Sequence, residues 1–133
     1  MQELVRVSLD AMGGDFAPQV TVQGAVEAVQ QKDNVKVFLV GLPDAIEAEL
    51  SKSTYDKDRI EVVAASEVID LLEPPVMAIR RKKDSSIVVG LNLVKNGQAD
   101  AFVSAGSTGA VLVGGQLVVG RIKGVERSPL ATL

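Results

Sequence analysis

The chain has 133 residues, of which 47% are hydrophobic, and this size and composition suit one globular domain with its own core. The 14 basic and 17 acidic side chains leave a net charge of -3, which provides no overall field for nucleic acid, so we expect no nucleic-acid partner and at most peripheral membrane contact. Cysteine and histidine are absent, which excludes disulfides, Ser-His-Asp triads and thiolate or imidazole metal sites, and we expect neither a metal nor a cofactor.

Short runs of β-type residues alternate with segments of helical periodicity along the chain. Prolines stand where three of the helices would begin, and a glycine follows the periodic part of a fourth. The predicted strands are Leu4–Leu9, Val35–Val40, Arg59–Ala64 and Ala99–Ser104. The predicted helices begin at Pro18, Pro43, Pro74 and Ser85, and a fifth covers Ala110–Val119. This alternation predicts βαβ units and an α/β fold, a three-layer α/β/α sandwich with a mostly parallel sheet.

The last third of the chain carries further expectations. Ala110–Val119 is apolar nearly all round, and a helix of that kind is usually buried. Ala101–Gly120 lacks charged residues, but its glycines and hydroxyl side chains favour a strand, loop and helix over a membrane span. With no signal peptide in the sequence, we expect a cytoplasmic protein. Because Arg127–Leu133 resembles the start of another strand, we expect residues 1–133 to form a single α/β domain, the N-terminal part of a longer chain.

A glycine-rich segment, Ser104–Gly109 (SAGSTG), follows the fourth predicted strand. Ligands of open parallel sheets bind beyond the carboxyl ends of strands. Glycines let backbone N–H groups approach an anion, Ser107 and Thr108 add hydroxyl donors, and a helix follows, so the segment suits a phosphate cradle. It matches neither the P-loop nor the dinucleotide-binding pattern. The alternative is that Ser107 or Thr108 caps the helix and the glycines only form a tight turn.

A second polar segment, Asp10–Asp15 (DAMGGD), follows the first predicted strand. Its position is also right for a ligand, with Gly13 and Gly14 permitting close approach. A carboxylate is a poor direct neighbour for phosphate, so Asp10 or Asp15 would orient a basic side chain, a substrate hydroxyl or a water. The alternative is a turn with capping aspartates.

A basic run precedes the fourth helix. Its cations can dock an acidic partner, or they can simply complement the dipole at the end of the third helix. The two serines that follow either contribute to the site or cap the next helix. The basic residues are Arg80, Arg81, Lys82 and Lys83, and the serines are Ser85 and Ser86.

Four sequence blocks, in consistent order, resemble the PlsX-type phosphate acyltransferases. They are LDAMGGD at Leu9–Asp15, RRKKDSS at Arg80–Ser86, VKNGQADAFVSAGSTGA at Val94–Ala110 and GRIKGVERSPLATL at Gly120–Leu133. The chain departs from the family pattern at Ser107, where we expect Asn, at Ser128-Pro129, where we expect Pro-Ala, and near Ala64, where we expect His. Serine at 107 keeps a hydrogen-bonding side chain.

The resemblance implies an enzyme that makes acyl phosphate from acylated acyl carrier protein and inorganic phosphate, for phospholipid synthesis. It further implies a homodimer, a fold similar to phosphotransacetylases and the isocitrate dehydrogenase group, and a downstream membrane acyltransferase that uses the product. On this basis Ser107, Thr108 and Asp10 are expected to be catalytic. The expected phosphate- or substrate-binding residues are Gly13, Gly14, Asp15, Ser85, Ser86, Ser104, Gly106 and Gly109, and Arg80–Lys83 would dock the carrier protein.

The expected chemistry needs no histidine or cysteine. Phosphate is largely ionised at neutral pH, with a second pKa of about 6. The leaving thiol has a pKa of about 8.5, so a strong general acid is dispensable. Positioning and oxyanion stabilisation by N–H and hydroxyl donors remain. Alternatives are a phosphotransacetylase-like enzyme acting on short acyl-CoA, and a non-catalytic module that binds phosphate or the carrier protein.

Overall fold

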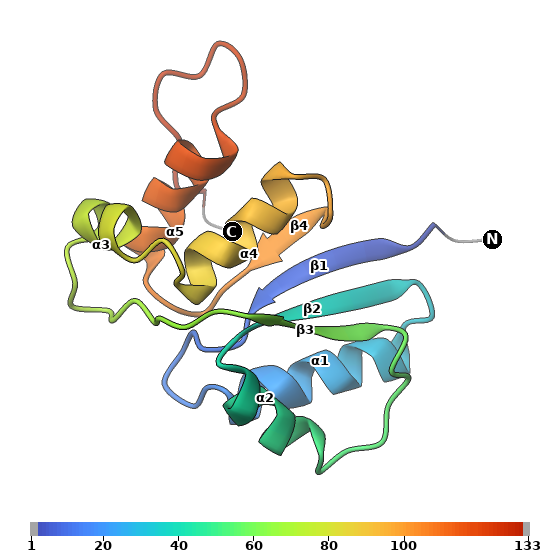
Figure 1. Cartoon of the computed structure of the whole chain (residues 1–133). Coiled ribbons are helices and arrows are strands. Elements are labelled where there is room, and N and C mark those ends of the chain that lie inside the picture. The colour runs from blue at the N-terminus through green and yellow to red at the C-terminus, as the bar shows by residue number, and fades with distance from the viewer. Residues whose placement is uncertain (1–2, 132–133) are drawn as a thin grey trace.

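The fold is an open parallel sheet covered by helices on both faces (Figure 1). The computed structural model describes residues 3–131. Its four strands lie in the order β3-β2-β1-β4, and every pairing is parallel. Their bounds are Val5–Asp10 for β1, Val35–Gly41 for β2, Ile60–Ala64 for β3 and Ala101–Val103 for β4.

Helices α1 and α2 cover one face of the sheet, and α4 covers the other, with α3 and α5 packed beyond it (Figure 1). This confirms the predicted α/β/α sandwich. The bounds are Gln19–Gln31 for α1, Pro43–Leu50 for α2, Pro75–Arg81 for α3, Ser86–Lys95 for α4 and Thr108–Gly114 for α5, and a π-helical turn, η1, covers Gly115–Val119.

Apolar side chains of the two sheet faces alternate along β2. Leu39 points to the side of α1 and α2, whereas Phe38 and Val40 point to the side of α4. The helical periodicity of α1 places its buried residues on the face toward the sheet, as the sequence predicts. These residues are Val22, Ala25, Val26 and Val29.

Helix α4 packs closely on the sheet at Gly90, where a side chain would not fit. A Cβ at Gly90 would stand 2.4 Å from Cε1 of Phe102 on β4. The buried Ser8 of β1 donates its hydroxyl hydrogen to the Gly90 carbonyl at 2.9 Å. Two strands and one helix are thereby held together directly behind the ends of β1 and β4.

Two expectations for the C-terminal part are wrong. The apolar helix begins at Thr108, changes to π-helical geometry at Gly115, and leaves apolar side chains exposed, Leu117 at 53%. No other described element covers this side of α5 and η1. An apolar pattern indicates that a helix can be buried, but it does not show which element would cover it. Residues 127–131 form no strand, while 132 and 133 lie outside the described residues. Within residues 3–131, no helix is long and apolar enough to cross a bilayer.

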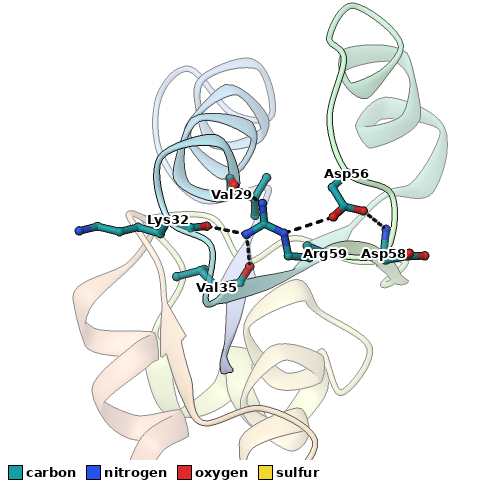
Figure 2. A network of polar contacts seen from close by, with 6 residues as sticks. All are labelled: Val29, Lys32, Val35, Asp56, Asp58 and Arg59. Carbon is teal, nitrogen blue, oxygen red and sulfur yellow. Dashed lines mark hydrogen bonds and ion pairs between the residues drawn. The ribbon is translucent and has the colours of Figure 1, made fainter. Parts of the chain in front are cut away.

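The guanidinium group of Arg59 joins three elements at the edge of the sheet opposite the site described below (Figure 2). It donates to the carbonyls of Val29 and Lys32, at the end of α1, and to that of Val35, where β2 begins. The last carbonyls of a helix have no partner within the helix, so this side chain satisfies acceptors that α1 cannot. Asp56 pairs with the same guanidinium at 3.4 Å.

Replacing Arg59 with Met is expected to lower the free energy of unfolding by about 1.5–3 kcal/mol, because hydrogen bonds from a charged donor are lost while carbonyls remain. Urea denaturation of the variant and the parent measures the difference. Lys57→Met, an exposed cation in the same loop, is the matched control and should change stability by less than about 0.5 kcal/mol. Equal losses of unfolding free energy in both variants would show that the hydrogen bonds of Arg59 make no specific contribution to stability.

Candidate functional site

The direction of chain progression reverses between β1 and β4. From β1 the chain passes outward to β2 and β3, and it then returns to place β4 on the other side of β1. The segments that follow β1 and β4 therefore leave the sheet on opposite sides of a crevice, which is where open parallel sheets bind ligands. Both segments that the sequence analysis selects, Asp10–Asp15 and Ser104–Gly109, lie at this position.

Hydrogen bonds connect the two segments. The Oδ2 atom of Asp10 accepts the hydroxyl of Ser104 at 2.8 Å, and its Oδ1 accepts the N–H of Met12 at 3.1 Å. The hydroxyl oxygen of Ser104 in turn accepts the N–H of Gly106 at 3.1 Å. Asp10 is 2% exposed, so its carboxylate positions the loop after β4 from within the protein.

Gly13 packs directly against this network. A Cβ at Gly13 would lie 2.6 Å from Oδ2 of Asp10, 2.9 Å from the nitrogen of Gly106 and 3.0 Å from the Ser104 hydroxyl. No other residue type fits that space without movement of backbone. Gly14 has φ +105, in the left-handed region that favours glycine. Glycine is thus required at the two positions for different reasons. At residue 13 the reason is the close approach of neighbouring atoms, and at residue 14 it is the backbone conformation.

A cavity of about 370 Å³, here called the switch-point cavity, opens between the two segments. Its wall combines glycine backbone, carboxylates, apolar side chains and one lysine. The lining residues are Met12, Gly13, Gly14, Asp15, Val68, Ile69, Asp70, Leu71, Lys82 and Gly106. The loop between β3 and α3 closes the side opposite the glycines.

Lys82 is the cation of this cavity among the described residues. Its Nζ donates to the carbonyl of Val68 at 2.8 Å and to Oε2 of Glu73 at 2.8 Å. The hydrogen bond from Lys82 holds the pKa of the Glu73 carboxyl below its ordinary value, with help from the N–H of Asp70. The ammonium group is therefore held at the cavity wall and does not extend into solvent with Arg80, Arg81 and Lys83, which are exposed.

The serines and Thr108 occupy several different environments. Ser107 is buried and caps α5 by accepting the N–H of Ala110 at 3.1 Å, and Ser85 caps α4 in the same way with the N–H of Val88. Both confirm the capping alternative for these hydroxyls. Ser86 is buried beside Ser85, and neither lines the switch-point cavity. Thr108 is exposed and Gly109 packs against Pro75 of α3. Their roles in binding substrate stay predictions.

Thr108 lines a second, mainly apolar cavity of about 430 Å³ on the other side of the loop after β4. It lies among α4, β4 and α5 and is here called the apolar groove. Its other walls include Leu91, Phe102, Val111 and Leu130. The segment Gly106–Thr108 therefore separates a polar cavity from an apolar one.

The sequence pattern predicts a docking surface that includes Lys82, and it gives no signal for a role of Val68–Leu71. In the sequence Lys82 is one of four consecutive cations, and this run does not indicate which of them turns inward. Within residues 3–131, no group of three or more acidic side chains is arranged to hold a metal ion.

The family model and the curated relatives that match this chain agree with each other. The family model described as "Fatty acid synthesis protein" matches residues 5–133. A "Phosphate acyltransferase" of Alkaliphilus oremlandii is 57% identical over 127 residues, and one of Clostridium kluyveri is 52% identical; each alignment covers 96% of this chain and 38% of the relative. The chain thus spans less than half the length of these relatives.

Among solved structures, the EutD phosphotransacetylase from Staphylococcus aureus superposes with a TM-score of 0.61 over 93% of this chain and 40% of that one. At 21% identity this likeness concerns the fold alone, and it confirms the expected similarity to the fold of phosphotransacetylases. The family model covers residues 5–133 and therefore nearly the whole chain. The chain belongs to the fatty acid synthesis protein family.

Proposed function

We propose that the protein transfers an acyl group from the thioester of acyl carrier protein to inorganic phosphate. The observation that carries this proposal is the relationship to proteins named phosphate acyltransferase, at 52% and 57% identity over 96% of the chain. The site geometry adds support, since the loop Gly106–Thr108 has a polar cavity on one side and an apolar groove on the other. Those two environments suit a phosphate and an acyl chain joined at one reacting carbon.

The reaction balances without a covalent enzyme intermediate. A phosphate oxygen of HPO₄²⁻ attacks the thioester carbonyl carbon, the C–S bond breaks, and the proton of the phosphate ends on the departing thiolate. The products are acyl phosphate and the free carrier thiol. The protein's contribution is to hold phosphate beside the carbonyl and to stabilise the negative charge that develops on its oxygen.

The residues divide into positioning and contacting groups. Asp10 holds the Ser104 hydroxyl, which holds the N–H of Gly106, so the buried carboxylate determines the shape of the loop. Gly13, Gly14 and Asp15 form the facing wall of the cavity. The hydroxyls of Ser107 and Thr108 are proposed to donate to phosphate or to the oxyanion. Ser107 can do so while it caps α5, because a hydroxyl donates one hydrogen and accepts others.

The proposal extends to the protein's surroundings, as the resemblance of the four sequence blocks to PlsX-type enzymes implies. The acylated carrier protein and inorganic phosphate are the substrates, the working form is a cytoplasmic homodimer, and a membrane acyltransferase consumes the product. Arg80 and Arg81 at the end of α3 and Lys83 just beyond it are exposed, and they remain the proposed contact for the acidic carrier.

The test is release of free carrier thiol from palmitoyl-acyl carrier protein, with and without phosphate, by this chain and by a longer chain that contains it. We expect phosphate-dependent release that falls at least about a hundredfold in the double variant Ser107→Ala with Thr108→Ala, the cost of losing oxyanion donors. Acetyl-CoA should be a poor substrate. The double variant Ser51→Ala with Thr54→Ala removes two exposed hydroxyls elsewhere and should retain the parent rate.

No phosphate-dependent release by the longer chain would contradict the proposed reaction. Faster reaction with acetyl-CoA than with the carrier thioester would instead indicate a phosphotransacetylase-like activity. Unfolding curves of the double variant separate loss of the α5 cap, which costs about 1 kcal/mol, from loss of catalysis.

A further inference from the structure

We propose that Lys82 binds the phosphate in the switch-point cavity, with Glu73 positioning its ammonium group, and that Lys82 does not belong to the carrier-docking surface. The identity of the anion rests on the proposed function. The placement of the lysine does not, because it follows from the cavity and its hydrogen bonds.

The position of the Lys82 side chain is the first argument. Lys82 follows the last residue of α3, and a cation there commonly turns back toward the final carbonyls of its own helix. Its Nζ instead reaches across to the loop after β3, to the carbonyl of Val68 and to Glu73. This brings the charge to the cavity that Gly13 and Gly106 line from the other side.

The number of donors is the second argument. An ammonium group has three hydrogens to donate, and the contacts with Val68 and Glu73 use two of them. The third is available to a ligand. The two protein acceptors also immobilise a side chain that otherwise loses considerable rotamer freedom on binding. Lys82 is therefore oriented before an anion arrives.

The charge of the cavity wall is the third argument. Asp15 and Asp70 also line the cavity, so a doubly charged anion would meet repulsion unless a cation stood close by. Within the described residues Lys82 is the cation available there. Glu73 offsets part of its charge, and the side chains of Lys82 and Glu73 are 31% and 30% exposed. An incoming phosphate shares Lys82 with Glu73.

The experiment measures binding of inorganic phosphate to this chain by calorimetry at constant ionic strength. Lys82→Met is expected to weaken binding about tenfold to a hundredfold, the effect of losing a hydrogen bond from a charged donor. Lys83→Met is the matched control, because it removes the next cation in the chain, which is exposed and lies outside the cavity wall. It should change the affinity less than about twofold. Lys82→Arg keeps the charge and should retain most of the binding.

Glu73→Gln separates anion binding from a structural role. Glutamine still accepts the hydrogen bond from Lys82 but no longer neutralises it, so phosphate should bind about two to five times more tightly. A lysine that only fastens the loop would give weaker or unchanged binding in this variant. If Lys82→Met does not fold, the direction of the Glu73→Gln change decides the question.

Equal phosphate affinity in the parent and Lys82→Met overturns the inference and leaves the proposed function standing. Absence of phosphate binding by the parent also overturns it. Phosphate binding that depends on Lys82, without thiol release by the longer chain, supports the inference while the proposed reaction fails.

Discussion

Gly13→Ala is expected to lower phosphate-dependent acyl transfer by at least about a hundredfold, since displacement of a site by 1 Å can have that effect. The added methyl group would stand 2.6 Å from the Asp10 carboxylate and 2.9 Å from the nitrogen of Gly106. Neither neighbour is the free end of a flexible side chain. One is fixed by hydrogen bonds to Ser104 and Met12, and the other is backbone. The loop after β4 has to move away from the loop after β1.

The same substitution should lower the free energy of unfolding by about 1–3 kcal/mol, the usual cost of overpacking. Gly24→Ala is the matched control, because a Cβ at Gly24, in the interior of α1, would meet no atom within 4 Å apart from its chain neighbours and the backbone of its own helix. Alanine there should stabilise the helix by about 0.5–1 kcal/mol and leave thiol release unchanged. An active, stable Gly13→Ala variant would show that the two loops are free to separate without consequence, and the proposed site would lose its central support.

Leu39→Ala is expected to reduce the free energy of unfolding by about 2–5 kcal/mol, from a total that is only about 5–15 kcal/mol for a typical domain. Leu39 is in β2, an inner strand, and no part of it is exposed. It packs in the cluster formed by α1 and α2 on the sheet, which includes Val22, Val29 and Ile46. Removing its outer carbons leaves a cavity that paired strands cannot close by moving.

Guanidinium denaturation followed by circular dichroism measures this loss. Leu72→Ala serves as the control for the same chemical change on the surface, because Leu72 is 92% exposed. It should alter stability by no more than about 0.5 kcal/mol. If the two leucines gave similar values, the core would not lie between β2 and the α1–α2 layer.

Much of the fold was predictable from local pattern. The four strands, and the four helices that begin at or beside Pro18, Pro43, Pro74 and Ser85, appear near the expected residues. Proline at helix starts and a helical spacing of apolar residues are local signals, and both depend on only a few neighbouring positions. β4 is shorter than predicted, Ala101–Val103, since its length depends on pairing with β1.

The candidate site was predictable in part for a related reason. Glycine-rich segments that follow strands can be recognised in the sequence, and a parallel sheet brings the carboxyl ends of its strands to one edge. The local sequence pattern does not indicate which strands are neighbours in the sheet. The β3-β2-β1-β4 order placed the Asp10 and Ser104 segments together, and this order results from crossovers that are chosen by the packing of whole helices.

By itself the sequence determined the exclusion of histidine and cysteine chemistry, the alternation of strands and helices and the two polar loops, because these follow from residue identity and short-range spacing. The tertiary structure alone decided that Asp10 bonds Ser104 and that Lys82 turns inward while Arg80, Arg81 and Lys83 stay outside. It also shows that Leu117 is exposed, although the apolar pattern of the sequence predicts that this helix is buried. Each of these depends on residues distant in the chain, and side-chain direction and burial are set by such neighbours rather than by local pattern.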